Sequence, residues 1–353
     1  MERLRKQYQR IVIKIGSSLL IKAQVIDRLI SQIVELIGRD KEREVILVSS
    51  GAIACGMGIL GLKTRPVKLS HLQAAASLGQ SELMEFYRGR FSAYNIKCAQ
   101  LLLTWDDFDD RDRYLSARNT LEVLLSWGSL PIINENDTVS VDEIKFGDND
   151  RLSALVANLI DADLLIILSD VEGLLNPKTE EVIRVVDRIT AKIERLASSS
   201  DKAVCVGGMK TKLSAARIAM ESQIPCLIVN GKKSNALELA LCDPYNAGTL
   251  FLPGDIRIPA RKRWLIFCAR PKGNINVDDG ARAALLAGKS LLSVGVIGIQ
   301  GHFIPGDIVD IMDGKGAAFA RGKVNFSAQD LDKIKGKQKM KEVVHCDNLV
   351  IKK

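Results

Sequence analysis

Short apolar runs alternate with longer helical patterns through the first 260 residues of the chain. Several of the short runs are apolar on both faces, which is typical of buried parallel strands. We expect strands at residues Arg10–Ile15, Glu44–Ser49, Ile96–Leu103, Leu130–Asn134, Leu164–Leu168 and Cys226–Val229. We expect helices at Gln24–Ile37, Leu69–Phe91, Asp112–Ser126, Asn149–Ile160 and Lys210–Glu221. This alternation predicts an α/β sandwich with ligand-binding loops at the carboxyl edge of the sheet.

The pattern changes from Lys262 onward, where short apolar runs are broken by glycine, as in the L-L-S-V-G-V-I-G-I-Q-G of residues 291–301. Such a pattern predicts a small β barrel. The charge changes at the same place, since residues 1–260 contain 33 Lys+Arg and 33 Asp+Glu while residues 261–353 contain 17 and 9. The net charge of +8 therefore belongs to the last part of the chain, and we predict two domains, 1–260 and 261–353.

Several classes of protein are disfavoured by the sequence. No apolar run reaches the roughly 18 to 20 residues of a membrane span, and the first ten residues lead into a strand instead of a signal-peptide core. We therefore expect a cytoplasmic protein without a membrane partner. The seven scattered cysteines form no C-x-x-C pair and are interpreted as reduced core residues. The three histidines lack metal-ligand spacing, so we expect no metal held by the protein itself.

Lysine and glycine at strand ends are the residues that phosphoryl transfer needs, because its charge is stabilised by cations and backbone N–H groups. Lys14 lies inside an apolar strand that opens into Gly16, Ser17 and Ser18, where the backbone could approach an anion closely. The alternative is a lysine that reaches solvent from an edge strand.

A second such position is V-G-G-M-K-T-K at residues 206–212, where a glycine-rich turn precedes a helix. Lysines in a first helical turn oppose the helix dipole, which suggests that a bound phosphate compensates them. The chain contains no G-x-x-x-x-G-K-[ST], so this is not a Walker P-loop. The candidate phosphate-binding residues here are Val206, Gly207, Gly208, Met209, Lys210, Thr211 and Lys212.

A polar substrate site is indicated by two clusters of asparagine and acidic residues, I-N-E-N-D-T at 133–138 and F-G-D-N-D at 146–150. Residues of these types also form ordinary turns and caps, and that interpretation stays open. The V-S-S-G-A-I run adds a further loop, whose Ser50 and Gly51 could hold a carboxylate. One motif is rejected: G-M-G-I-L-G at 56–61 fits G-x-G-x-x-G but lacks the strand and helix context of a dinucleotide site.

Six segments in order resemble the glutamate 5-kinases, a branch of the amino acid kinase family: V-I-K-I-G-S-S, V-S-S-G-A-I, I-N-E-N-D, G-D-N-D-R-L-S-A, L-S-D-V-E-G-L and G-G-M-K-T-K. Two later segments, R-K-R-W-L-I-F and D-D-G-A-R-A-A-L, resemble the entry to a PUA domain. The resemblance implies the amino acid kinase fold, a three-layer sandwich around a mainly parallel sheet. It also implies transfer of a phosphoryl group from ATP with Mg²⁺ to the γ-carboxylate of L-glutamate, the first step of proline biosynthesis.

Residue roles follow from this resemblance. Lys14 and Lys212 would neutralise the transferring phosphoryl group, and Asp150 would hold both lysines. The glutamate-binding set would be Ser50, Gly51, Asn134, Asp137, Asp148 and Asn149. The ATP-binding set would be Lys14, Gly16, Ser169, Asp170 and residues 206–212. The family loop usually reads G-T-G-G-M, so Val206 here could offer only its backbone.

The resemblance further implies a homo-oligomer, feedback inhibition by proline and a partner reductase for the glutamyl phosphate. Two other functions stay open. A related kinase could act on aspartate or an acylated glutamate, because a fold does not define its substrate. The basic PUA domain could instead serve an RNA-associated role.

Overall fold

The computed structural model describes residues 8–40, 42–140, 149–198, 208–254, 259–337 and 341–352. The chain separates into two compact units, Met1–Arg257 and Ile258–Lys353. The domain limits predicted from the sequence, 1–260 and 261–353, stay a prediction. In the described parts of the chain, no helix is both long and apolar enough to cross a membrane.

The first unit is built on one eight-stranded sheet with the strand order β3-β4-β2-β1-β5-β7-β8-β6. Every pair is parallel except β7 and β8, which are antiparallel. The strands are β1 (Arg10–Ile15), β2 (Glu44–Val48), β3 (Cys98–Leu103), β4 (Leu130–Glu135), β5 (Leu164–Ser169), β6 (Val185–Val186), β7 (Cys226–Asn230) and β8 (Gly248–Phe251). The carboxyl ends of β4, β2, β1 and β5 therefore lie side by side along one edge.

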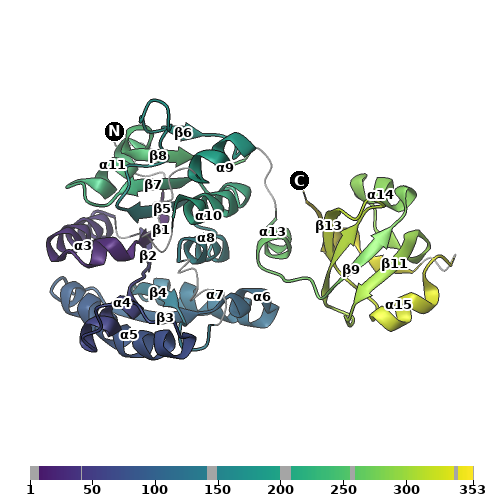
Figure 1. Cartoon of the computed structure of the whole chain (residues 1–353), viewed down its shortest axis with the longest axis horizontal. Coiled ribbons are helices and arrows are strands. Elements are labelled where there is room, and N and C mark those ends of the chain that lie inside the picture. The colour runs from purple at the N-terminus through teal and green to yellow at the C-terminus, as the bar shows by residue number, and fades with distance from the viewer. Residues whose placement is uncertain are drawn as a thin grey trace. The chain divides into compact units, whose positions relative to one another are not determined.

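Helices cover both faces of this sheet (Figure 1). One face packs on α3 (Ala23–Gly38), α4 (Ala52–Ile59), α5 (Leu69–Ser92) and α11 (Ala236–Cys242), with a continuous apolar core between. The other face carries α7 (Arg111–Ser126), α8 (Asn149–Leu159) and α10 (Met209–Glu221). Shorter helices in the connections are α2 (Ser17–Leu20), α6 (Trp105–Asp109), α9 (Ala191–Ser198) and α12 (Pro244–Ala247). The predicted three-layer sandwich around a mainly parallel sheet is confirmed.

Helix α4 was not predicted from the sequence, and it contains Gly56, the first glycine of the rejected G-x-G-x-x-G match. A side chain at Gly56 would place its Cβ 1.8 Å from the backbone oxygen of Ala75. A Cβ at Gly79 would likewise lie 1.8 Å from the oxygen of Ala52. These two glycines therefore let α4 and α5 pack backbone against backbone, which is a structural role.

The second unit contains a five-stranded sheet with the order β11-β9-β12-β13-β15 and a separate pair, β10 with β14. Its strands are β9 (Gly273–Val277), β10 (Leu291–Leu292), β11 (Val296–Gly301), β12 (Ile308–Met312), β13 (Ala318–Lys323), β14 (Glu342–Val344) and β15 (Leu349–Ile351). The helices are α13 (Ala260–Phe267), α14 (Asp279–Leu286) and α15 (Ala328–Ile334). The unit has its own apolar core, which includes Ile275, Val309 and Phe303.

Candidate active site

One buried carboxylate holds two lysines from distant parts of the sequence. Lys14 Nζ lies 2.5 Å from Asp150 Oδ1, and Lys212 Nζ lies 3.0 Å from Asp150 Oδ2. The two lysines are each 6% exposed and Asp150 is 1% exposed. Charges at this depth persist only when they are paired, so the three residues form one electrostatic unit.

Two opposing effects set the ionisation of Asp150. Burial alone would raise the pKa of its carboxyl group, but the ammonium groups of Lys14 and Lys212 outweigh burial and lower this pKa to about 2. Asp150 is therefore ionised throughout the physiological range. With one carboxylate for two ammonium groups, this cluster carries an excess of positive charge, which suits a phosphoryl group.

The fold explains why these residues meet. Lys14 is the fifth residue of β1 and pairs in register with Val48 of β2 and Ile167 of β5, so it lies at the carboxyl edge of the sheet. Asp150 lies in the first turn of α8, where a carboxylate is favoured by the helix dipole. Lys212 lies in the first turn of α10, which packs on α8, and there the adjacent Asp150 offsets the unfavourable dipole.

The predicted ATP-binding residues lie on the β5 side of Lys14. The N–H of Gly16 donates to the Leu168 oxygen at 3.1 Å, which ties the turn after β1 to the end of β5. A Cβ at Gly16 would lie 3.2 Å from the Leu168 oxygen, which is a tight contact, and 3.9 Å from Lys14 Nζ, which is an ordinary one. Ser169 ends β5 and is buried, while Asp170 next to it is half-buried. The structure thus brings these residues and Lys14 together.

The residues at the start of α10, also predicted to bind ATP, differ in their exposure and contacts. Gly208 precedes the helix, Met209 is buried in its first turn and Lys210 is exposed. Val206 and Gly207 lie outside the described residues. Thr211 was assigned to ATP binding, but its hydroxyl lies 2.9 Å from Asp150 Oδ2 and 2.9 Å from the Gly208 oxygen. Its side chain therefore contacts the carboxylate that holds the lysines.

The predicted glutamate-binding residues lie on the other side of Lys14, at the ends of β2 and β4. Asn149 Nδ2 donates to the Ser49 oxygen at 2.6 Å and to Asn134 Oδ1 at 2.7 Å. Ser50 follows Ser49 and is half-buried. Gly51 has a φ of +98°, a left-handed conformation that glycine adopts without strain, and it directly precedes α4. Asp137 is half-buried in the turn after β4, and Asp148 lies outside the described residues.

Helix α5 contributes three polar residues to this side that the sequence analysis missed. Gln73 Nε2 donates to the Ser140 oxygen at 3.3 Å, Gln80 Oε1 accepts from Asn134 Nδ2 at 2.7 Å, and Tyr87 Oη lies 2.9 Å from Ser49 Oγ. The three are spaced by seven residues and so follow one stripe of the helix. That spacing of seven residues was the available signal, in a helix that also carries many other polar residues.

The order of the strands divides the site into two halves. Asn134 of β4 and Ser49 after β2 lie on one side of Lys14, and Ser169 of β5 lies on the other. Adjacent strands are about 4.8 Å apart, so a small acceptor beside β2 and a nucleotide beside β5 could meet at Lys14. The geometry supports transfer of a charged group between two ligands.

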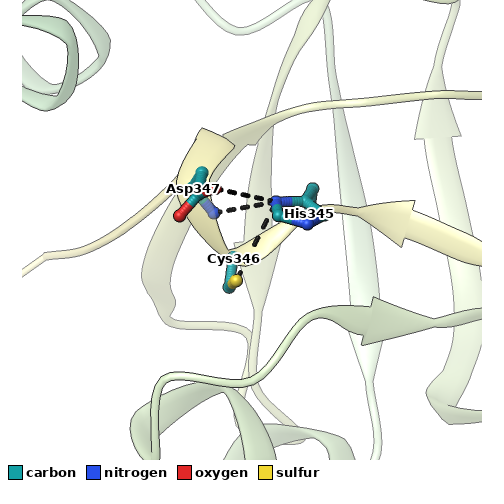
Figure 2. A group of neighbouring side chains, drawn as sticks. All are labelled: His345, Cys346 and Asp347. Atoms are coloured by element: carbon teal, nitrogen blue, oxygen red, sulfur yellow. Dashed lines mark hydrogen bonds and ion pairs between the residues drawn. The ribbon is translucent and has the colours of Figure 1, made fainter.

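The second unit contains a separate cluster of metal-ligand residues, His345, Cys346 and Asp347, shown in Figure 2. His345 Nδ1 accepts the Asp347 N–H at 3.1 Å, and Cys346 Sγ lies 3.8 Å from the same nitrogen. The Nδ1 lone pair, on the side of the ring that faces Cys346 and Asp347, is thus engaged in capping the short turn at residues 346–348. We assign this cluster a structural role.

Comparison with known proteins agrees with this geometry. The sequence model of the amino acid kinase family matches residues 9–230, and that of the PUA domain matches residues 273–346. The chain belongs to the amino acid kinase family and carries a PUA domain in its second unit.

Relatives match over nearly the full length. The chain is 43% identical over 371 aligned residues to the glutamate 5-kinase of Citrifermentans bemidjiense, covering 99% of each protein. It is 44% identical over 368 residues to the glutamate 5-kinase of Moorella thermoacetica, covering 98% of this chain and 97% of that one. The resemblance inferred from the six sequence segments is confirmed.

A solved structure shares the fold. The crystal structure of N-acetylglutamate synthase from Neisseria gonorrhoeae, complexed with coenzyme A and L-arginine, superposes with a TM-score of 0.52. The alignment covers 81% of this chain and 68% of that one at 16% sequence identity, so it shows a common architecture alone.

Proposed function

We propose that this chain transfers the γ-phosphoryl group of ATP to the γ-carboxylate of L-glutamate, giving ADP and L-glutamyl 5-phosphate, the first step of proline biosynthesis. The observation that carries the proposal is the buried unit of Asp150 with Lys14 and Lys212, with candidate ligand-binding residues on either side of it along the sheet edge. Full-length relatives with the name glutamate 5-kinase support the choice of acceptor.

In the proposed mechanism, the ionised γ-carboxylate of glutamate attacks phosphorus directly. It needs no general base, because it carries no proton to remove. Charge spreads over the equatorial oxygens of the transferring group, and the ammonium groups of Lys14 and Lys212 stabilise it. Asp150 does not react. It holds both lysines in position before ATP binds, so the two ammonium groups need not move when the transition state forms.

The nucleotide half would consist of Gly16, Ser169, Asp170 and residues 206–212, with the backbone at the start of α10 facing the phosphates and the Thr211 hydroxyl directed to Asp150. Mg²⁺ would be held largely by the nucleotide itself, and when bound it would add positive charge at the β- and γ-phosphate oxygens. The one carboxylate of the lysine cluster, Asp150, is already engaged by two ammonium groups, so we assign it no role as a metal ligand.

The acceptor half would consist of Ser50, Gly51, Asn134, Asp137, Asp148 and Asn149. The side-chain amides of Asn134 and Asn149 are buried and linked by a hydrogen bond. This rigid pair fits recognition of the α-amino and α-carboxylate groups, which every α-amino acid has. The γ-carboxylate would then extend toward Lys14. We further propose that the enzyme works in the cytoplasm as a homo-oligomer, is inhibited by proline, and passes its unstable acyl phosphate to a reductase.

The test is to trap the acyl phosphate with hydroxylamine while the acceptor is varied. With equal concentrations of L-glutamate, L-aspartate and N-acetyl-L-glutamate, the proposal expects most hydroxamate from glutamate. A larger yield from either of the other two would assign the chain to a different amino acid kinase. No ATP-dependent hydroxamate from any acceptor, with the protein folded, would favour the RNA-associated alternative.

A further inference from the structure

Gln80, on helix α5, belongs to a chain of hydrogen bonds whose direction is fixed by the backbone at both ends. The N–H of Glu135 can only donate, and it donates to Asn134 Oδ1 at 3.0 Å. The oxygen of Ser49 can only accept, and it accepts from Asn149 Nδ2 at 2.6 Å. These two backbone groups therefore determine which way each asparagine amide is turned.

The orientation of Gln80 follows from that of Asn134. Because Asn134 Oδ1 already accepts from Glu135 and Asn149, its Nδ2 is the group that faces Gln80. Gln80 must therefore offer its oxygen, and Gln80 Oε1 lies 2.7 Å from Asn134 Nδ2. The amide nitrogen Nε2 of Gln80 is thus held beside the asparagine pair, and within the described parts of the chain no acceptor is bonded to it.

The burial of the three amide residues indicates which of them a ligand could reach. Asn134 is 1% exposed and Asn149 is 9% exposed, whereas Gln80 is only partly buried. Gln80 also occupies the middle of the stripe on α5 whose other members contact Ser140 and Ser49. Its Nε2 can therefore meet a ligand at the ends of β2 and β4.

The position of the lysines determines which part of the acceptor would meet Gln80. The γ-carboxylate has to reach the phosphoryl group at Lys14, which lies on β1. The amide network lies two strands away, at the end of β4. The α-amino and α-carboxylate groups are therefore left for the amide network, and a neutral N–H donor such as Gln80 Nε2 suits the carboxylate.

We propose that Gln80 binds the α-carboxylate of the acceptor amino acid through its Nε2–H and so contributes to selection of an α-amino acid. This inference rests on the proposed function. It goes beyond the candidate residues found from the sequence, in which Gln80 had no role.

The variant Gln80→Glu distinguishes a role of Gln80 in binding the acceptor from a role in orienting Asn134. A glutamate side chain can still accept from Asn134 Nδ2, so the bond that orients Asn134 is kept, but it cannot donate and it repels a carboxylate. Loss of one hydrogen bond to a charged group should raise KM for glutamate roughly 10- to 100-fold, with KM for ATP unchanged. Ser77→Glu adds the same charge at an exposed position of α5 and should leave both KM values unchanged.

Two acceptor analogues locate the contact. With 4-aminobutyrate, which lacks the α-carboxylate, the ratio of wild-type to Gln80→Glu kcat/KM should fall to about one. With glutarate, which keeps both carboxylates and lacks the amino group, the ratio should stay as large as with glutamate. Gln80→Ala serves for the same comparison if Gln80→Glu does not fold.

An unchanged KM for glutamate in Gln80→Glu would overturn the proposal, as would an equal loss with all three acceptors, which would indicate a purely structural role. If Gln80→Glu lowered kcat/KM with glutamate but not with glutarate, Gln80 would contact the amino group of the acceptor instead. Each of these results leaves the proposed function intact, because that function fails only if the wild-type enzyme does not use glutamate.

Discussion

Lys212 Nζ lies 3.0 Å from Asp150 Oδ2 although 62 positions separate the two residues in the sequence. The contact joins the first turn of α10 to the first turn of α8, and Lys14 completes it from β1. The end of a strand and the starts of two helices, far apart in sequence, therefore converge on one carboxylate.

Replacing Asp150 with Asn should lower kcat much more than it raises KM for ATP. The amide keeps the shape of the side chain but no longer fixes two ammonium groups, so the loss falls on the transition state. Steady-state kinetics with ATP varied at saturating glutamate measures both constants. A change confined to KM would show that Asp150 serves nucleotide binding.

The same variant should reveal how Asp150 contributes to stability at different pH values. The pKa of Asp150 is about 2 in the folded protein, against an ordinary value near 4 when unfolded. A lowered pKa stabilises the folded state above the unfolded value, and this contribution is lost as pH falls through the folded value. The difference in melting temperature between the wild type and Asp150→Asn should therefore shrink between about pH 4 and pH 2. A constant difference over this range would contradict the ion pairing.

Thr211 is expected to act through Asp150. Thr211→Val removes the hydroxyl that contacts Asp150 Oδ2, and loss of one such hydrogen bond should lower kcat about 10-fold with little change in KM for ATP. Thr211→Ser keeps the hydroxyl and should be close to wild type. If Thr211→Val instead raised KM for ATP at an unchanged kcat, the side chain would be a nucleotide ligand.

Much of the first unit could be predicted from the sequence because its strands are nearly continuous apolar runs. β1 was predicted with its observed bounds, and α5, α8 and α10 differ from prediction by a single residue at one end. Helix α4 was missed, because its two glycines, Gly56 and Gly58, lower helix propensity, and the reason for Gly56 is seen only in the packing of α4 against α5.

The residues of the candidate site could be predicted from the sequence where a charged or polar side chain lies at the end of a strand. Lys14 and the polar residues after β4 follow this rule. Gln80 and Tyr87 do not, because they lie inside a helix and their partners, Asn134 and Ser49, are 54 and 38 positions away. The contact of Thr211 with Asp150 depends on the packing of α10 against α8, which periodicity alone does not specify.

A chain that ends at residue 260 should fold and retain kinase activity. All proposed catalytic and ligand-binding residues lie before that point, and each unit has its own apolar core. Hydroxamate formation and a cooperative thermal transition in the truncated chain would confirm the prediction. An insoluble or inactive product would show that the first unit needs residues beyond 260.

The most direct test of the central claim is a double-mutant cycle on Lys14 and Lys212. Loss of one donor that stabilises transition-state charge typically lowers kcat about 100- to 1,000-fold, so Lys14→Ala and Lys212→Ala should each do so. Because both serve one phosphoryl group, the double variant should lose far less than the product of the two single losses. Lys210→Ala, at an exposed position of the same helix, is the matched control: Lys210 is proposed to bind nucleotide only, so kcat should stay near wild type whatever happens to KM for ATP. Losses that simply multiply, or a Lys210→Ala variant as impaired as Lys212→Ala, would contradict the account.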